Sequence, residues 1–115
     1  MPLLKLQTSV AVPEARKDSL LKACSKIVAE ATGKPEAYVM VMLDAGAGCL
    51  NGKAEPVAVA DVRGIGGLKK EVNQRLTAAL CDLLLKELKI APDHVYATFT
   101  DVPASNWGWN KTTFG

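Results

Sequence analysis

The sequence predicts a single α+β domain, residues 1–115, in which two helices cover one face of a four-stranded mixed sheet. A chain of 115 residues is long enough for one hydrophobic core but not for two. Its hydrophobic pattern gives the order strand, helix, strand twice. A shift of 57 positions aligns the two halves, about 1–57 and 58–115, with these identities: Cys24 with Cys81, Glu30 with Glu87, Pro35 with Pro92, and Asp44 with Asp101. We interpret the chain as a duplicated β-α-β unit.

The first half opens with an apolar strand at Leu3–Thr8, followed by a helix over Ala15–Ala31. The apolar residues of this helix recur on one face: Leu20, Leu21, Cys24, Ile27, Val28 and Ala31. Gly33 and Pro35 are typical of a helix end. Tyr38–Leu43 scarcely alternates between apolar and polar residues, which predicts a strand that is buried on both sides.

The second half follows a glycine-rich loop and begins with a strand over Val57–Arg63. A second helix is predicted over about Lys69–Lys89. Its apolar face consists of Val72, Leu76, Leu80, Leu83, Leu84 and Leu88. The last clear strand is Val95–Thr100, and the tail around Asn106–Trp109 is a candidate for a further short strand.

Composition and charge exclude several classes of protein. The net charge of +2, with lysines scattered along the chain, gives no indication of nucleic-acid binding. No apolar run approaches the roughly 18 residues of a membrane span, and no signal peptide is recognisable. We therefore expect no membrane partner and a cytoplasmic location, with export by a non-classical route as the alternative.

The three cysteines and the single histidine show no metal-ligand spacing, so we expect no metal and no other cofactor. Cys24 and Cys81 occupy equivalent apolar helix positions and are expected in the core. Cys49 falls in a loop, where we expect it to be exposed. His94, just before the last strand, is also expected to be exposed.

The predicted architecture leaves one face of the sheet without a helix. The Tyr38–Leu43 and Val57–Ala60 strands are apolar on both faces, so the bare face calls for a further covering layer. No chain remains to supply that layer. We therefore expect a homo-oligomer, with pockets between subunits.

Pro2 is the candidate catalytic residue. A small second residue generally allows removal of the initiator methionine, which leaves the proline nitrogen as a free secondary amine. An α-amino group titrates near pH ~8, and a dry or cation-lined site lowers its pKa further, so that it can act as a general base at neutral pH. The alternative is a proline that merely starts an edge strand.

Two features near the predicted helix ends leave alternatives open. Lys34 either complements the dipole of the first helix or binds a substrate carboxylate close to Pro2. The backbone amides of Gly64–Gly67 either form an ordinary turn or bind an anion before the second helix.

The last strand and the tail leave similar alternatives. Tyr96, Thr98 and Thr100 share one face of their strand, which is either a solvated edge or a pocket lining. The aromatic residues Trp107, Trp109 and Phe114 either pack on the fold or form the wall of a site for a flat ring.

Several of these segments together resemble the macrophage migration inhibitory factor family of the tautomerase superfamily. The segments that carry the resemblance are Met1-Pro2, Ala31-Thr32-Gly33-Lys34-Pro35, Glu55-Pro56, Gly64-Ile65-Gly66, Pro92-Asp93-His94-Val95-Tyr96 and Asn106-Trp107-Gly108-Trp109-Asn110-Lys111-Thr112-Thr113-Phe114. The last two segments are the most specific, and the resemblance covers nearly the whole chain.

The resemblance implies a homotrimer with three active sites at subunit boundaries. It implies a cofactor-independent isomerase, a keto–enol tautomerase of phenylpyruvate-like aromatic 2-oxo acids and, in vitro, of dopachrome-type compounds. Pro2 would be the acid/base. The implied substrate-binding residues are Lys34, the backbone amide of Ile65, Tyr96 from the neighbouring subunit, Thr98, Trp107, Trp109 and Phe114. The alternative is a cytokine-like protein that binds a receptor or host partner, with tautomerase activity secondary.

Three departures from the family pattern affect these expectations. Thr98 stands where asparagine is frequent, which shortens a polar contact. Trp107 replaces the usual valine and is expected to reshape or narrow the pocket mouth. Val57-Ala58-Val59-Ala60 stands in place of a C-x-x-C pair, so no thiol–disulfide activity is expected.

Overall fold

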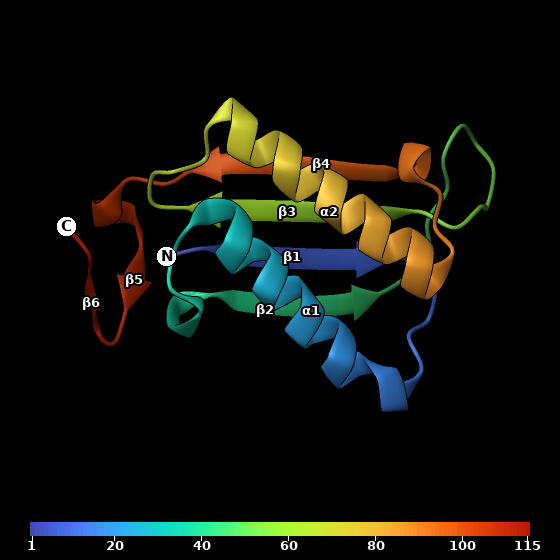
Figure 1. Cartoon of the computed structure of the whole chain (residues 1–115), viewed down its shortest axis with the longest axis horizontal. Coiled ribbons are helices and arrows are strands. Elements are labelled where there is room, and N and C mark those ends of the chain that lie inside the picture. Colours follow the sequence, from blue (N-terminus) through green and yellow to red (C-terminus); the bar gives the residue numbers. More distant parts are fainter.

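The computed structural model describes residues 1–115, with two long helices lying across one face of a four-stranded sheet (Figure 1). The strands of this sheet are β1 (Leu3–Thr8), β2 (Met40–Ala45), β3 (Ala58–Gly64) and β4 (Val95–Asp101). The helices are α1 (Glu14–Thr32) and α2 (Lys70–Leu88). The short elements are β5 (Gly108–Trp109), β6 (Thr112–Thr113) and the 3-10 turns η1 (Glu36–Tyr38), η2 (Pro92–His94) and η3 (Ala104–Asn106).

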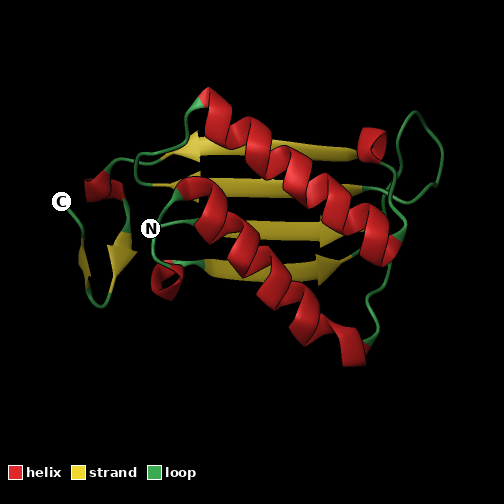
Figure 2. Cartoon of the chain, viewed as in Figure 1, coloured by secondary structure: helices red, strands yellow, loops and turns green.

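The sheet is mixed, with the strand order β2-β1-β3-β4. β1 pairs in parallel with β2, and β3 pairs in parallel with β4. The two central strands, β1 and β3, are antiparallel. Figure 2 shows both helices on the same face of the sheet. The predicted fold class is confirmed. Neither helix has the length and apolar character needed to cross a lipid bilayer.

The hydrophobic core lies between the sheet and the helices, because alternate strand residues meet one face of each helix. Its members are Leu4, Leu6, Val12, Leu20, Cys24, Val28, Ala58, Ala60, Val62, Leu76, Leu80, Cys81, Leu84, Leu88, Ile90 and Val95. Burial raises the pKa of the Cys24 thiol to about 11. The expected burial of Cys24 and Cys81 and the exposure of Cys49 are confirmed.

Two element boundaries differ from the prediction. Tyr38 does not begin a strand, because Pro35 and Glu36 accept the backbone hydrogen bonds of a 3-10 turn. β2 begins only at Met40, whose amide donates to the Pro2 carbonyl at 3.1 Å. The tail adds two short strands rather than one, and they pair with each other instead of joining the main sheet. Their turn has positive φ at Asn110 and Lys111, as tight hairpins require.

The prediction for His94 is wrong, since its side chain is only 23% exposed. Its Nδ1 lies 3.0 Å from the Pro56 carbonyl oxygen and its Nε2 lies 3.4 Å from a Glu55 carboxylate oxygen. The turn η2 directs the imidazole against the segment that leads into β3. His94 therefore anchors that segment.

The face of the sheet away from the helices is mixed in character. Met40 and Met42 of β2 are 59% and 57% exposed, so this strand is buried on both sides only if another chain covers it. The centre of the same face is polar, because Lys5 lies opposite Asp61 in the β1–β3 ladder. The apolar character expected of β2 and the start of β3 holds at Met40, Met42 and Val59, whereas the neighbouring centre of the face is polar.

The packing of the core predicts that two leucines of α2 contribute very differently to the stability of the fold. Leu80 is fully buried, whereas Leu85 is 48% exposed. We expect Leu80→Ala to lower the free energy of unfolding by about 2–5 kcal/mol, because it removes a packed side chain and leaves a cavity. Leu85→Ala, the matched control, should change it by roughly 0.5 kcal/mol. Urea denaturation followed by circular dichroism measures both values, and similar losses in the two variants would contradict this packing.

Candidate active site

Pro2 lies immediately before β1, at one end of the sheet, and its side chain is fully buried. The β1–β3 register pairs Leu3 with Arg63, which brings Pro2 level with the residues that leave β3. The amino-terminal amine, carried here by Met1, lies in the same region. Its pKa is lowered from the ordinary value, first by partial burial and then by the charge and hydrogen bonding of Lys34. This end of the sheet thus favours an uncharged amine.

Lys34 reaches this end of the sheet from the exit of α1. Gly33 ends the helix in the left-handed conformation, with φ of 70°. The Lys34 ammonium then donates to the Ile65 carbonyl at 2.6 Å and to the Gly66 carbonyl at 3.1 Å. Lys34 therefore does not cap α1. It joins the end of α1 to the turn after β3.

The turn after β3 wraps closely around Lys34. Gly66 and Gly67 have φ of 71° and 81°, a conformation that favours glycine. A Cβ at Gly67 would lie 3.2 Å from Cε of Lys34, so the close approach also needs glycine. The Ile65 amide has no hydrogen-bond acceptor within the chain. This free N–H can bind an anion, and the positive charge of the Lys34 ammonium beside it favours one.

Tyr96 and Thr98 lie elsewhere on the sheet. Tyr96 pairs with Val59, which is four positions along β3 from Arg63, or roughly 13 Å at the rise of a strand. Thr98 pairs with Asp61, and its hydroxyl donates to that carboxylate at 3.2 Å. One chain therefore brings together Pro2, Lys34 and Ile65 but not Tyr96 or Thr98. The supply of Tyr96 by a neighbouring subunit stays a prediction.

The three tail aromatics lie beyond the Pro2 end of the sheet, with the β5–β6 hairpin (Figure 1). Trp107 is half-buried and shares a hollow with Leu3 and Arg63. The rings of Trp109 and Phe114 stack with centroids 5.6 Å apart and planes at 14°. Both remain exposed, at 54% and 39%. They pack on each other rather than on the core, which leaves them available to form the wall of a site.

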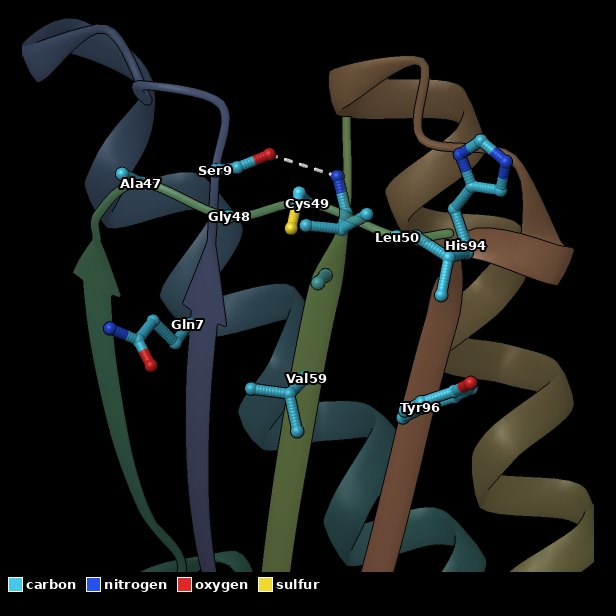
Figure 3. A pocket seen from close by; sticks show the side chains of 11 residues that line it. Gln7, Ser9, Ala47, Gly48, Cys49, Leu50, Val59, His94 and Tyr96 are labelled. Atoms are coloured by element: carbon cyan, nitrogen blue, oxygen red, sulfur yellow. Dashed lines mark hydrogen bonds between the residues drawn. The ribbon is translucent and has the colours of Figure 1, made fainter. Parts of the chain in front are cut away.

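A second hollow, of about 190 Å³, opens at the opposite end of the sheet (Figure 3). Tyr96 and His94 line one side of it, Gln7 the other, and the loop that carries Cys49 crosses its end. The hydroxyl of Ser9, a further lining residue, accepts a hydrogen bond from the Val57 amide at 2.9 Å. Segments far apart in the chain form this hollow, so no local sequence pattern indicates it.

Two residues at the Pro2 end were also missed. Tyr38 is 51% exposed in the turn before β2, just four residues after Lys34. Arg63 lies near the end of β3 and on the same face of the sheet as Leu3. The alternation of β3 would have identified Arg63 as an outward-facing cation next to the Gly64–Gly67 turn.

The whole chain, residues 1–115, matches the family model described as macrophage migration inhibitory factor (MIF). A macrophage migration inhibitory factor homolog of Brugia malayi is 35% identical over 116 residues, with both chains fully covered. The structure of a homologue from Prochlorococcus marinus is 38% identical, with a TM-score of 0.92 over 98% of this chain and 99% of that one. The structure of Pt0534 inactivated by 2-oxo-3-pentynoate is 26% identical, with a TM-score of 0.82 over 93% and 90% of the two chains.

The contact between Lys34 and the amino terminus predicts a measurable titration shift. In protein that retains Met1, we expect Lys34→Gln to raise the pKa of the terminal amine, because a positive charge and a hydrogen-bond donor are lost. The pKa should stay below the ordinary value, since burial, the largest cause, persists. A pH titration followed by ¹⁵N NMR measures it. Lys53→Gln, in the loop before β3, is the control, and an equal shift in both variants would contradict the contact.

Proposed function

This chain belongs to the macrophage migration inhibitory factor family, and from that membership we propose that it is a cofactor-independent keto–enol tautomerase of aromatic 2-oxo acids. The observation that carries the proposal is the meeting of three groups at one end of the sheet. The buried Pro2, the Lys34 ammonium and the unpartnered Ile65 amide supply a base and two donors for an anion. Such a combination suits proton transfer next to a carboxylate.

The proposed reaction begins once Met1 has been removed and the Pro2 nitrogen is a free secondary amine. In its neutral form this nitrogen takes a proton from the carbon next to the keto group, and the same proton is then delivered to the keto oxygen to give the enol. The reverse sequence converts the enol to the keto acid. Partial burial and the nearby Lys34 charge, which lower the pKa of the Met1 amine, would favour the neutral form of the Pro2 amine in the same way.

Lys34 and Ile65 would hold the substrate in this reaction. The Lys34 ammonium and the Ile65 N–H would bind the substrate carboxylate or its oxygen. Negative charge that develops on the keto oxygen is stabilised by donors already in place, which need not reorganise during the reaction. Support for a 2-oxo acid substrate comes from Pt0534, since its structure is of a protein inactivated by 2-oxo-3-pentynoate.

The remainder of the site would be completed in a homotrimer. Tyr96 lies too far along β4 to serve Pro2 of its own chain, so we assign it to the site of a neighbouring subunit. Trp107, Trp109 and Phe114 would form the aromatic wall. Phenylpyruvate fits this chemistry, and dopachrome-type compounds would react in vitro.

A cytokine-like role is the second candidate function. It rests on the names of the curated relatives, which include the macrophage migration inhibitory factors of Meriones unguiculatus and Xenopus laevis, each 34% identical to this chain. Such a role would require a receptor partner that recognises the outer surface. It does not exclude the tautomerase reaction.

We expect Pro2→Gly to lower kcat/KM for phenylpyruvate at least about a hundredfold, because a primary amine in a looser chain replaces the held secondary amine. Mass spectrometry must first show that Met1 is absent from both proteins. Absorbance of the enol then measures the rate.

Leu85→Gln, an exposed change on the outer helix surface, serves as the control and should retain wild-type turnover. Undiminished turnover by Pro2→Gly would refute the assignment of the base. Receptor binding that persists in Pro2→Gly, without turnover in either protein, would favour the cytokine-like role.

A further inference from the structure

A second cation, Arg63, lies at the Pro2 end of the sheet and takes no part in the proposed proton transfer. It is the register partner of Leu3, and its side chain is 51% exposed on the face away from the helices. A hollow of about 220 Å³ lies beside Arg63 and is lined by Leu3, Arg63, Val102, Asn106, Trp107 and Gly108. The hollow thus combines apolar walls with one guanidinium group.

A short chain of hydrogen bonds orients Arg63. The Thr98 hydroxyl donates to Oδ1 of Asp61 at 3.2 Å, and Nε of Arg63 donates to Oδ2 of the same carboxylate at 3.4 Å. At that distance the ion pair is weak, and it engages only the Nε side of the guanidinium. No hydrogen bond within the chain uses the two Nη groups. The planar end of Arg63 is therefore available for a carboxylate, which it can bind through parallel hydrogen bonds.

Arg63 and Lys34 provide two separate anion-binding points on either side of the turn after β3. Lys34 is bound to the carbonyls of Ile65 and Gly66, whereas Arg63 lies two residues before Ile65 on the open face. The hollow beside Arg63 is smaller than the roughly 300–1,000 Å³ of sites that enclose a whole ligand, so it suits one end of a molecule. The apolar residues of the hollow, Leu3, Val102 and Trp107, lie beside Arg63 and suit the hydrocarbon end of a ligand whose carboxylate Arg63 binds.

We propose that Arg63 is a specificity-determining residue that binds a second, distal carboxylate, so that the preferred substrates are 2-oxo acids with two anionic groups. This inference rests on the proposed function, which supplies the position of the reacting carbons next to Pro2. Asp61 and Thr98 are positioning residues, since they act on the substrate through Arg63. Thr98, shorter than asparagine, suits this role because its hydroxyl reaches the Asp61 carboxylate across the β3–β4 ladder.

The test compares phenylpyruvate with 4-carboxyphenylpyruvate, which differ only in the distal carboxylate. We expect the wild-type protein to have the higher kcat/KM for the dicarboxylate. Arg63→Gln should lower the ratio of the two kcat/KM values about tenfold or more, chiefly through KM, as the loss of a charge-assisted hydrogen bond predicts. Arg63→Lys should keep part of the preference. Arg75→Gln, which removes an arginine from the outer helix α2, should leave the ratio unchanged.

The positioning residues require a separate comparison. Thr98→Val should lower the same ratio, because it removes the hydrogen bond to Asp61, and Thr98→Ser should restore it because the hydroxyl returns. A loss of fold would affect both substrates and would not be rescued by serine. An unchanged ratio in both Arg63→Gln and Thr98→Val would overturn the proposal.

Equilibrium binding separates this inference from the proposed reaction. Calorimetric titration with 4-carboxycinnamate and with cinnamate measures the same preference without turnover. Tighter binding of 4-carboxycinnamate than of cinnamate by the wild-type protein, if this preference is lost in Arg63→Gln, supports the inference. Absence of turnover of both oxo acids would refute only the tautomerase proposal and would leave this binding result intact. Equal binding of the two ligands by the wild-type protein, or a preference that survives in Arg63→Gln, overturns the inference.

Discussion

The antiparallel pairing of β1 with β3 determines where each functional group of this chain lies. Because Leu3 pairs with Arg63, the amino terminus lies level with the residues that leave β3. The same ladder carries Gln7 and Val59 to the opposite end of the sheet. A register shift of one residue would turn the buried leucines of β1 to the open face, so packing in the core fixes the register. The register in turn fixes the positions of the site residues.

The hydrogen bonds of Lys34 complete this arrangement. Two carbonyl acceptors hold its ammonium over the turn after β3, where its charge acts on the amino-terminal amine. Glycine at positions 66 and 67 makes the close approach possible. The result is a partly buried, positively charged end of the sheet. An amine there is more easily neutral, and a bound anion is favoured, so a single arrangement supports both halves of the proposed chemistry.

The open face of the sheet bears on the proposal that the site is shared between subunits. Its exposed methionines on β2 and its exposed Tyr96 on β4 lie on opposite edges, with a polar centre between them. Asp61 connects Thr98 to Arg63 within that centre. A neighbouring subunit that covered the edges would leave the polar centre accessible to water. The proposed homotrimer would then contain no second hydrophobic core on this face.

The local pattern of the sequence was enough to identify both helices, four strands and the helix-facing leucines, because burial imposes periods of 3.6 and 2 on apolar residues. It also pointed to Pro2, Lys34 and Ile65 through chemistry and resemblance. The pattern did not reveal the 3-10 turn at Tyr38, the partial burial of His94 or the hollow beside Tyr96. The turn is local, with hydrogen bonds to Pro35 and Glu36, but the apolar run that contains Tyr38 resembles a strand. The other two features depend on packing between segments far apart in the chain.

The sequence by itself therefore determined the elements of this protein and the kinds of chemical group that it carries. The tertiary structure alone decided which of these groups meet. It placed the Lys34 ammonium on the turn after β3 instead of at the α1 terminus, and it separated Tyr96 from Pro2. It also placed Arg63 within hydrogen-bond distance of Asp61, which accepts a further hydrogen bond from Thr98. The physical reason is that local propensities act over a few residues, whereas these distances are set by strand register and by contacts between both halves of the chain.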